Sequence, residues 1–248
     1  MNQRGAVTFD FHNTLANCDT WFQLEVRTLV STYLRWDALR RATAVDEAEL
    51  IAADARYRVL RTAIMDHGHE ETAERCVALV LTDLGLSPDG DSITAGIAEL
   101  MRGALDEATP VPGALETVRA IAARGVPLGI VSSAVYHPFL EWTLARFGIR
   151  DVFTDVTTSA SAGYYKGRPE LFWHASRQLG VEPDRVVHVG DSFKWDVGGA
   201  RRAGMHAVWY RTGASRPEDE PATPDLTVDT LEGAALPILQ ILGDGDHR

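Results

Sequence analysis

Residues 6–15 read Ala-Val-Thr-Phe-Asp-Phe-His-Asn-Thr-Leu, and this stretch decides how the rest of the chain is interpreted. A β-rich apolar run ends abruptly in Asp10, and His12 follows where the chain must turn. Side chains two residues apart in a strand point to the same side, so Asp10 and His12 are expected to face one space. A carboxylate can act as a nucleophile, and an imidazole can transfer a proton near neutral pH. The stretch therefore predicts a catalytic pair at the end of a strand.

A long stretch without a convincing strand follows this first strand. Its segments are rich in Ala, Leu, Arg and Glu, with the apolar spacing of amphipathic helices, and they cover residues 21–43, 46–66, 70–84 and 92–107. From Pro110 onward, helical segments alternate with apolar or β-branched runs, at residues 126–132, 152–157, 185–190 and 205–210, with a last short strand at 226–228. A glycine closes each of five helical runs: Gly85, Gly125, Gly148, Gly180 and Gly204.

Alternation of helix and strand predicts an α/β fold, a Rossmann-like parallel sheet core with helices on both faces. The helical stretch interrupts this sheet after its first strand, so we expect it to form a separate all-helical domain. The predicted domains are residues 1–16 with 109–248 for the α/β core, and residues 17–108 for the helical insertion.

Composition limits the classes of partner. The chain has 248 residues, 45% hydrophobic and 24% charged, which is typical of a soluble globular protein. A net charge of −11 argues against nucleic acid or an anionic membrane as the main partner. Cys18 and Cys76 do not suggest a disulfide framework. No apolar run approaches the roughly 18 residues of a membrane helix, and no signal-peptide pattern opens the chain. We expect a cytoplasmic protein, a monomer or a homodimer.

The predicted strand ends carry polar side chains, and ligands bind at the carboxyl ends of strands in open parallel sheets. Ser132–Ser133 ends the second strand, and Lys166 lies in the loop after the third. Asp191 follows the fourth strand, with Asp196 five residues later. Together with Asp10 this makes three carboxylates, which repel one another unless a cation intervenes. An all-oxygen ligand set suits Mg²⁺.

These motifs resemble those of the haloacid dehalogenase-like (HAD) hydrolase superfamily, in the subgroup with a helical cap inserted after the first motif. Residues 9–15 resemble the first motif, and the second, third and fourth motifs follow in order at Ser132, Lys166 and Asp191 with Asp196. The resemblance covers residues 6–15 and 110–213, and four motifs in order at four strand ends make it specific.

The resemblance implies hydrolysis of a small phosphorylated metabolite, a phosphomonoester, through an aspartyl-phosphate. The residues that it implies are Asp10, His12 and Lys166 for catalysis, Ser132, Ser133 and Lys166 for phosphate, and Asp10, the carbonyl of His12, Asp191 and Asp196 for Mg²⁺. A closable cap favours small substrates over polymers. Trp21 and Phe22 lie where the family's flap leads into the cap, and we interpret them as packing residues.

One departure leaves alternatives open. His12 stands where phosphatases of the family usually carry a second Asp, so its proton-transfer role rests on the imidazole itself. A phosphotransferase, a metal-independent 2-haloacid dehalogenase and a regulatory phosphate-binding relic remain alternatives. Family members that cleave phosphonates typically use a lysine in the cap. The chain's only lysines are Lys166 and Lys194, outside the predicted cap, which argues against that reaction.

Overall fold

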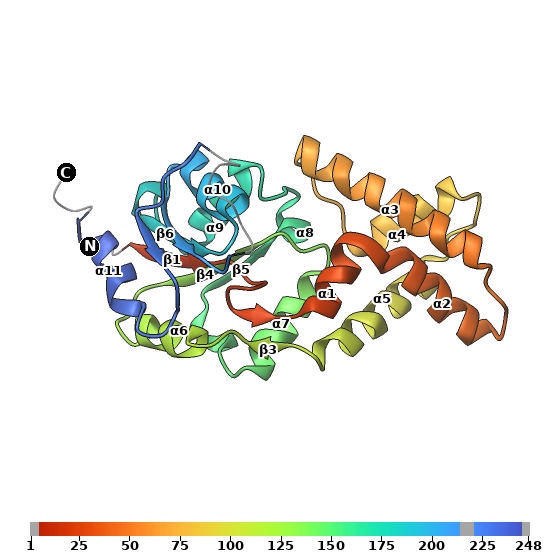
Figure 1. Cartoon of the computed structure of the whole chain (residues 1–248), viewed down its shortest axis with the longest axis horizontal. Coiled ribbons are helices and arrows are strands. Elements are labelled where there is room, and N and C mark those ends of the chain that lie inside the picture. Colours follow the sequence, from red (N-terminus) through yellow and green to blue (C-terminus); the bar gives the residue numbers. More distant parts are fainter. Residues whose placement is uncertain (1–4, 214–220, 245–248) are drawn as a thin grey trace.

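The computed structural model describes residues 5–213 and 221–244, and its centre is a six-stranded parallel sheet (Figure 1). The strand order is β5-β4-β1-β6-β7-β8. The strands are β1 (Ala6–Phe9), β4 (Leu128–Ser132), β5 (Asp155–Thr158), β6 (Val186–Gly190), β7 (His206–Tyr210) and β8 (Leu226–Val228). Strand β1 is central and pairs with β4 on one side and β6 on the other. The prediction of a parallel α/β sheet is confirmed.

Helices cover both faces of this sheet. On one face lie α9 (Pro169–Leu179) and α10 (Gly198–Arg202), and on the other α6 (Ala114–Ala122), α7 (His137–Arg146) and α11 (Ala235–Asp244). Successive side chains of a strand point to opposite faces of the sheet, so alternate residues pack into the hydrophobic cores on its two sides. In β1, Val7 and Phe9 pack on the α6 side, whereas Ala6 packs on the α9 side.

Between the short strands β2 (Ala16–Asn17) and β3 (Thr109–Pro110) the chain is helical, and we call residues 19–105 the helical segment. It contains α1 (Asp19–Gln23), the π-helical turn η1 (Leu24–Thr28), α2 (Leu29–Arg41), α3 (Glu47–His67), α4 (Ala73–Asp83) and α5 (Gly90–Leu105). Strands β2 and β3 pair antiparallel, so the chain enters and leaves the segment at one point. The segment lies beyond the carboxyl ends of the sheet strands (Figure 1).

Three predicted elements differ in detail from the structure, for local reasons. The expected helical stretch over residues 21–43 forms α1, η1 and α2 and is interrupted at Thr28, whose φ of −123° and ψ of 9° are not helical. The helix expected from residue 70 begins at Ala73, because the Thr72 side chain caps it by accepting from Arg75 N. The strand expected from residue 152 begins at Asp155, after the 3₁₀ turn η2 (Arg150–Val152).

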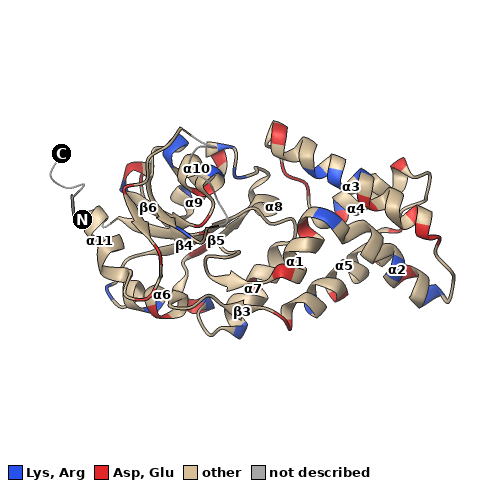
Figure 2. Cartoon of the chain, in the orientation of Figure 1, with Lys and Arg blue, Asp and Glu red and all other residues tan. Residues whose placement is uncertain are grey.

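Short turns complete the described chain: α8 (Ser159–Ala162), η3 (Pro183–Arg185) and η4 (Phe193–Val197). The five glycines predicted to close helical runs all have positive φ, between 63° and 81°, as left-handed helix ends require. Residues of both charge signs are interspersed along the helical segment and the sheet-covering helices (Figure 2). No helix among the described residues is long and apolar enough to cross a membrane.

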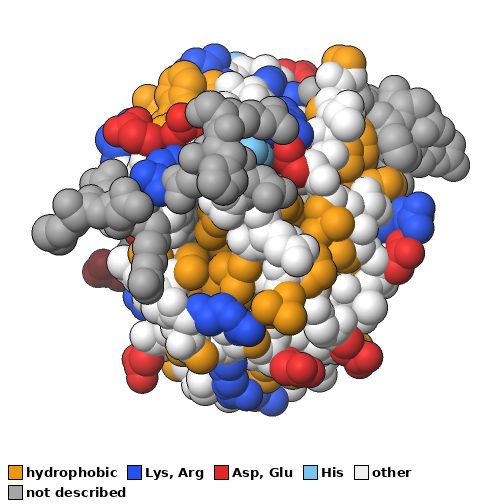
Figure 3. All heavy atoms as spheres, turned by 90° about the vertical axis from the view of Figure 1, so that its left-hand side faces the viewer, with side chains coloured by type: hydrophobic (Ala, Val, Ile, Leu, Met, Phe, Trp, Pro, Cys, Tyr) orange, Lys and Arg blue, Asp and Glu red, His pale blue; other side chains and the backbone are white. Residues whose placement is uncertain are grey.

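The end of the molecule that carries α11 has a hydrophobic area near the middle of its surface (Figure 3). Leu236 of α11 is 58% exposed. Because α11 and the helical segment lie at opposite ends (Figure 1), this surface is remote from the carboxyl ends of the strands.

Candidate active site

The strand order places the sequence-predicted residues together. The chain passes from β1 to β4 and β5 on one side and then returns to β6 on the other side of β1. Such a reversal is where ligands bind in open α/β sheets. Asp10 follows β1 and Asp191 follows β6, at neighbouring strand ends, since Phe9 pairs with Val189.

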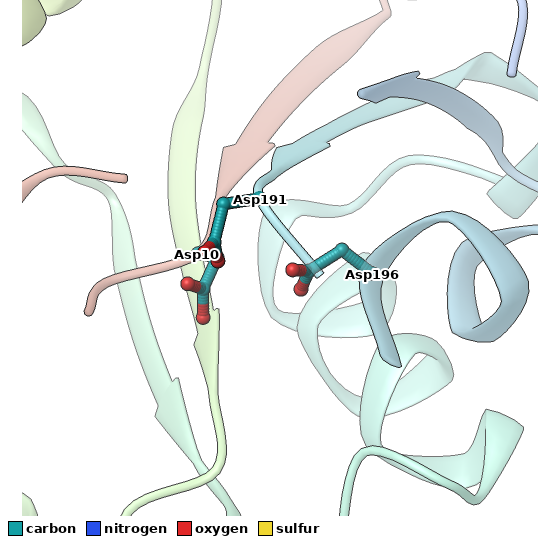
Figure 4. A group of neighbouring side chains, drawn as sticks. All are labelled: Asp10, Asp191 and Asp196. Atoms are coloured by element: carbon teal, nitrogen blue, oxygen red, sulfur yellow. The ribbon is translucent and has the colours of Figure 1, made fainter. Parts of the chain in front are cut away.

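Three carboxylates converge at this reversal. Oxygen atoms of Asp10, Asp191 and Asp196 all lie within 4.8 Å of one another. Figure 4 shows the three side chains directed toward a common space, Asp10 and Asp191 from strand ends and Asp196 from η4. The expected gathering of these carboxylates is therefore present in the structure.

Asp196 is held rigidly by its own loop. Its carboxylate lies against Gly190, where an added Cβ would come within 2.2 Å of Asp196 Cγ. Only glycine fits at this position. Ser192 N donates to Asp196 Oδ2 at 2.8 Å, and Ser192 Oγ caps η4 by accepting from Trp195 N at 3.2 Å.

Lys166 lies between two of the carboxylates and is 3% exposed. Its Nζ forms ion pairs with Asp10 and Asp196. Its backbone N donates to Ser133 Oγ at 3.3 Å, which joins the lysine loop to the residue after β4. Ser132, the last residue of β4, is buried beside this junction. The structure thus brings the predicted lysine and serines to one edge of the site.

The charges of the site are not balanced. Burial raises the pKa of Asp10 to about 6, although Lys166 opposes the shift. Burial and the Asp10 carboxylate raise the pKa of Asp191 to about 8. Although burial opposes it, Lys166 and the hydrogen bond from His188 hold the pKa of Asp196 at about 2. One lysine therefore does not compensate three carboxylates, and an oxygen-lined site with excess negative charge fits a divalent cation such as Mg²⁺.

Two site residues were missed at the sequence level, Thr8 and His188. They are register partners in β1 and β6 and both are fully buried. Thr8 Oγ1 lies 2.9 Å from His188 Nδ1, and His188 Nε2 lies 3.1 Å from Asp196 Oδ1. This buried chain supports Asp196 from inside the sheet. The available signal was a histidine within the apolar strand Val186–Gly190.

The His12 ring lies at the mouth of the site. It stacks on Phe22, with ring centroids 4.5 Å apart and an interplanar angle of 12°. Its Nδ1 lies 3.3 Å from Cys18 Sγ, and its Nε2 lies 4.0 Å from Asp19 Oδ1. Burial lowers the pKa of His12, against a smaller opposing effect of Asp19. The neutral ring is therefore favoured at neutral pH.

A cavity of about 200 Å³ adjoins these groups. Asp10, His12 and Ser132 line it together with the aromatic side chains of Trp21 and Phe22. Trp21 is 1% exposed and stacks on Phe139, so it is a packing residue that also contributes to the wall. Phe22 is 38% exposed, stacks on His12 and lines the cavity.

A family model of haloacid dehalogenase-like hydrolases matches residues 5–204 of this chain. The chain belongs to this family. The HAD-like hydrolase fold accounts for the sheet order and for the position of the carboxylates at the strand ends. The resemblance inferred from the four motifs is confirmed.

Several curated relatives of this HAD-like hydrolase are named phosphatases. A glyceraldehyde 3-phosphate phosphatase of Methanopyrus kandleri is 30% identical over 90% of this chain and 92% of its own length. A phosphoserine phosphatase of Thermus thermophilus is 40% identical over 46% of this chain and 45% of its own length. A 2-haloacid dehalogenase structure from Pseudomonas syringae superposes with a TM-score of 0.68, covering 97% of this chain and 98% of that one. At 22% identity, this last similarity shows the fold alone.

Proposed function

We propose that this protein is a Mg²⁺-dependent phosphatase that hydrolyses a small phosphomonoester through an aspartyl-phosphate formed on Asp10. The observation that carries the proposal is the convergence of Asp10, Asp191 and Asp196 with Lys166 beside a cavity of about 200 Å³. The names of the curated relatives support it, and they make glyceraldehyde 3-phosphate and phosphoserine the first substrates to test.

The metal ligands in this proposal are Asp10, Asp191, Asp196 and the backbone carbonyl of His12. Burial, together with the neighbouring carboxylates, raises the pKa of Asp10 and of Asp191, and a cation there would favour their ionised forms. When bound, Mg²⁺ would offset the repulsion between these carboxylates and an incoming phosphate.

In the first step, a carboxylate oxygen of Asp10 attacks phosphorus while the bond from phosphorus to the alcohol oxygen breaks. Lys166 and Ser132–Ser133 hold the remaining phosphate oxygens. The protonated form of His12, which its lowered pKa makes the minor form at neutral pH, gives its proton to the departing alkoxide. In the second step, the neutral ring takes a proton from water, which attacks phosphorus, releases phosphate and regenerates Asp10. The lowered pKa of His12 suits the second step.

We also propose that residues 17–108 act as a cap over the site. The support is the paired β2 and β3, which bring the segment's two connections to one place, as a hinge requires. Phe22, on the first helix after this connection, lines the cavity and stacks on His12. Closure would exclude water from the site and limit the substrate to a small molecule.

The test is hydrolysis of p-nitrophenyl phosphate with Mg²⁺ or with EDTA. We expect Mg²⁺-dependent turnover that Asp10→Asn abolishes and that Asp151→Asn, at an exposed aspartate remote from the site, leaves unchanged. Turnover that persists in EDTA or in Asp10→Asn would contradict the mechanism. Chloride release from 2-chloropropionate without metal would indicate the dehalogenase alternative.

Two further alternatives are separated by the same assay. An inert wild type combined with an active His12→Asp variant would indicate a regulatory relic that has lost its proton-transfer group. Phosphate transfer to an added sugar or alcohol in preference to water would indicate a phosphotransferase, since the aspartyl-phosphate then passes to a hydroxyl. We expect water to be the acceptor.

A further inference from the structure

A buried group of three ionisable side chains, Arg61, Glu25 and Glu70, connects the helical segment to the loop after β4. Arg61 of α3 is 3% exposed. Its Nη1 lies 2.5 Å from Glu70 Oε1, and its Nη2 lies 3.5 Å from Glu25 Oε1. Glu25 is 2% exposed and Glu70 is 9% exposed. Removing charges from water is expensive even when they are paired, so this arrangement is not explained by stability alone.

The two carboxylates are linked to consecutive backbone amides of the loop that follows β4, Glu25 directly and Glu70 through the Ser159 hydroxyl. Both oxygens of Glu25 accept from Val135 N, at 2.9 and 3.1 Å. Glu70 Oε2 accepts from Ser159 Oγ at 2.7 Å, and Ser159 Oγ in turn accepts from Ala134 N at 2.8 Å. The helical segment thus fixes Val135 directly and Ala134 through one serine.

Further contacts extend the connection to both phosphate-binding loops. Ala73 N donates to Val135 O at 2.9 Å. Tyr165 precedes Lys166, and its ring lies under the Arg61 guanidinium, with Arg61 Cζ 5.9 Å from the ring centroid. Tyr165 N donates to the carbonyl of Gly68 at 3.0 Å. The same part of the helical segment therefore touches the loop after Ser132–Ser133 and the loop that carries Lys166.

We propose that Arg61, Glu25 and Glu70 form a clamp through which the docked helical segment holds Ser132 and Ser133 in their phosphate-binding position. These three are positioning residues, since none of them lines the cavity. Arg61 keeps the two carboxylates together, and each carboxylate fixes one amide of the loop. Phosphate affinity then depends on docking of the segment. This inference rests on the proposed phosphatase function.

Ser159→Ala is the mildest test, because it removes one hydroxyl, which bridges Glu70 to Ala134 N and also contacts Ala134 O at 3.2 Å. Ser176→Ala is the matched control, a buried serine on α9 whose Oγ donates to Val181 O away from the loop. The readouts are amide hydrogen exchange at Ala134, the inhibition constant of inorganic phosphate with Mg²⁺ present, and the melting temperature.

We expect Ser159→Ala to raise the inhibition constant of inorganic phosphate about tenfold, the equivalent of one lost hydrogen bond. Amide exchange at Ala134 should accelerate by about the same factor or more, because its acceptor is gone. Ser176→Ala should lower the melting temperature comparably and leave both other readouts at their wild-type values.

Equal weakening of phosphate inhibition in both variants, or unchanged exchange at Ala134 in Ser159→Ala, would overturn the clamp. A second variant, Glu25→Gln, tests the direct contact from Glu25 to Val135 N. Its readout is the rate of amide exchange at Val135 compared with the rate at Ala134. If wild type hydrolyses no phosphomonoester, the proposed function fails. The exchange measurements, which need no turnover, then still decide whether the clamp holds the loop.

Discussion

Replacing Asp191 by asparagine should stabilise the metal-free protein while abolishing its activity. Asp191 is 9% exposed, and burial with the Asp10 and Asp196 carboxylates raises its pKa to about 8 from 3.8. A carboxyl group whose pKa is higher in the folded state contributes stability only while it is protonated. This contribution is complete below pH 3.8 and is lost as the pH rises to about 8.

The size of this destabilisation follows from the pH interval between 3.8 and about 8. Each pH unit above 3.8 lowers the free energy of unfolding by about 1.4 kcal/mol, so the loss at pH 7 approaches about 4 kcal/mol. Burial is the largest cause of this loss, and repulsion by the Asp10 and Asp196 carboxylates adds to it. Because asparagine removes the charge but leaves a buried polar amide, we expect a net gain of about 2 kcal/mol. For a chain of 248 residues that corresponds to about 4–8 °C in melting temperature.

The assay is thermal unfolding of wild type, Asp191→Asn and the exposed control Asp151→Asn, in EDTA and then in saturating Mg²⁺. In EDTA, the advantage of Asp191→Asn should grow between about pH 4 and pH 8. Mg²⁺ should raise the melting temperature of wild type well above its effect on Asp191→Asn. The reasoning is refuted if Asp191→Asn melts below wild type in EDTA at pH 8, or if Mg²⁺ stabilises both proteins equally.

Three further predictions use other parts of the chain. Burial raises the pKa of Glu25 to about 8, so stability from its protonated form is lost between pH 4.5 and 8. Glu25→Gln should therefore gain on wild type across this range with or without Mg²⁺, and parallel melting profiles would contradict this. Ala42 ends α2 with a φ of 52°, so Ala42→Gly should raise the melting temperature by about 2–4 °C, for roughly 1 kcal/mol of relieved strain. His12→Ala should slow hydrolysis of alkyl phosphates far more than that of p-nitrophenyl phosphate, whose leaving group needs little protonation; equal rate losses would exclude His12 as the acid.

The sequence predicted those features that local chemistry determines. Residues at strand ends were identifiable because an apolar run stops at a polar side chain, as at Asp10 and Asp191. Their proximity followed from a general property of parallel sheets, and the register of Phe9 with Val189 bears it out. Helix ends were predictable where glycine closes them. The break at Thr28 was not, because it arises from a backbone conformation that helix propensity does not forbid.

Features that depend on contacts between distant segments were not predictable. Thr8 and His188 meet because β1 pairs with β6, although 180 residues separate them. Glu25 and Glu70 read as ordinary helix-surface acids, yet both are buried against a loop after β4. The sequence does not signal that Glu25 is buried, because its partner Arg61 lies 36 residues away on another helix.

The electrostatics of the site imply an order of events. With all groups ionised, Asp10, Asp191, Asp196 and Lys166 carry more negative than positive charge, and the whole chain has a net charge of −11. A phosphate dianion approaching this site meets repulsion, whereas a divalent cation is attracted. Protons compete with the cation, because the raised pKa values of Asp10 and Asp191 are the response of the site without it. Cation affinity should therefore rise with pH up to about 8, and under the proposed mechanism we expect the cation to bind before phosphate does.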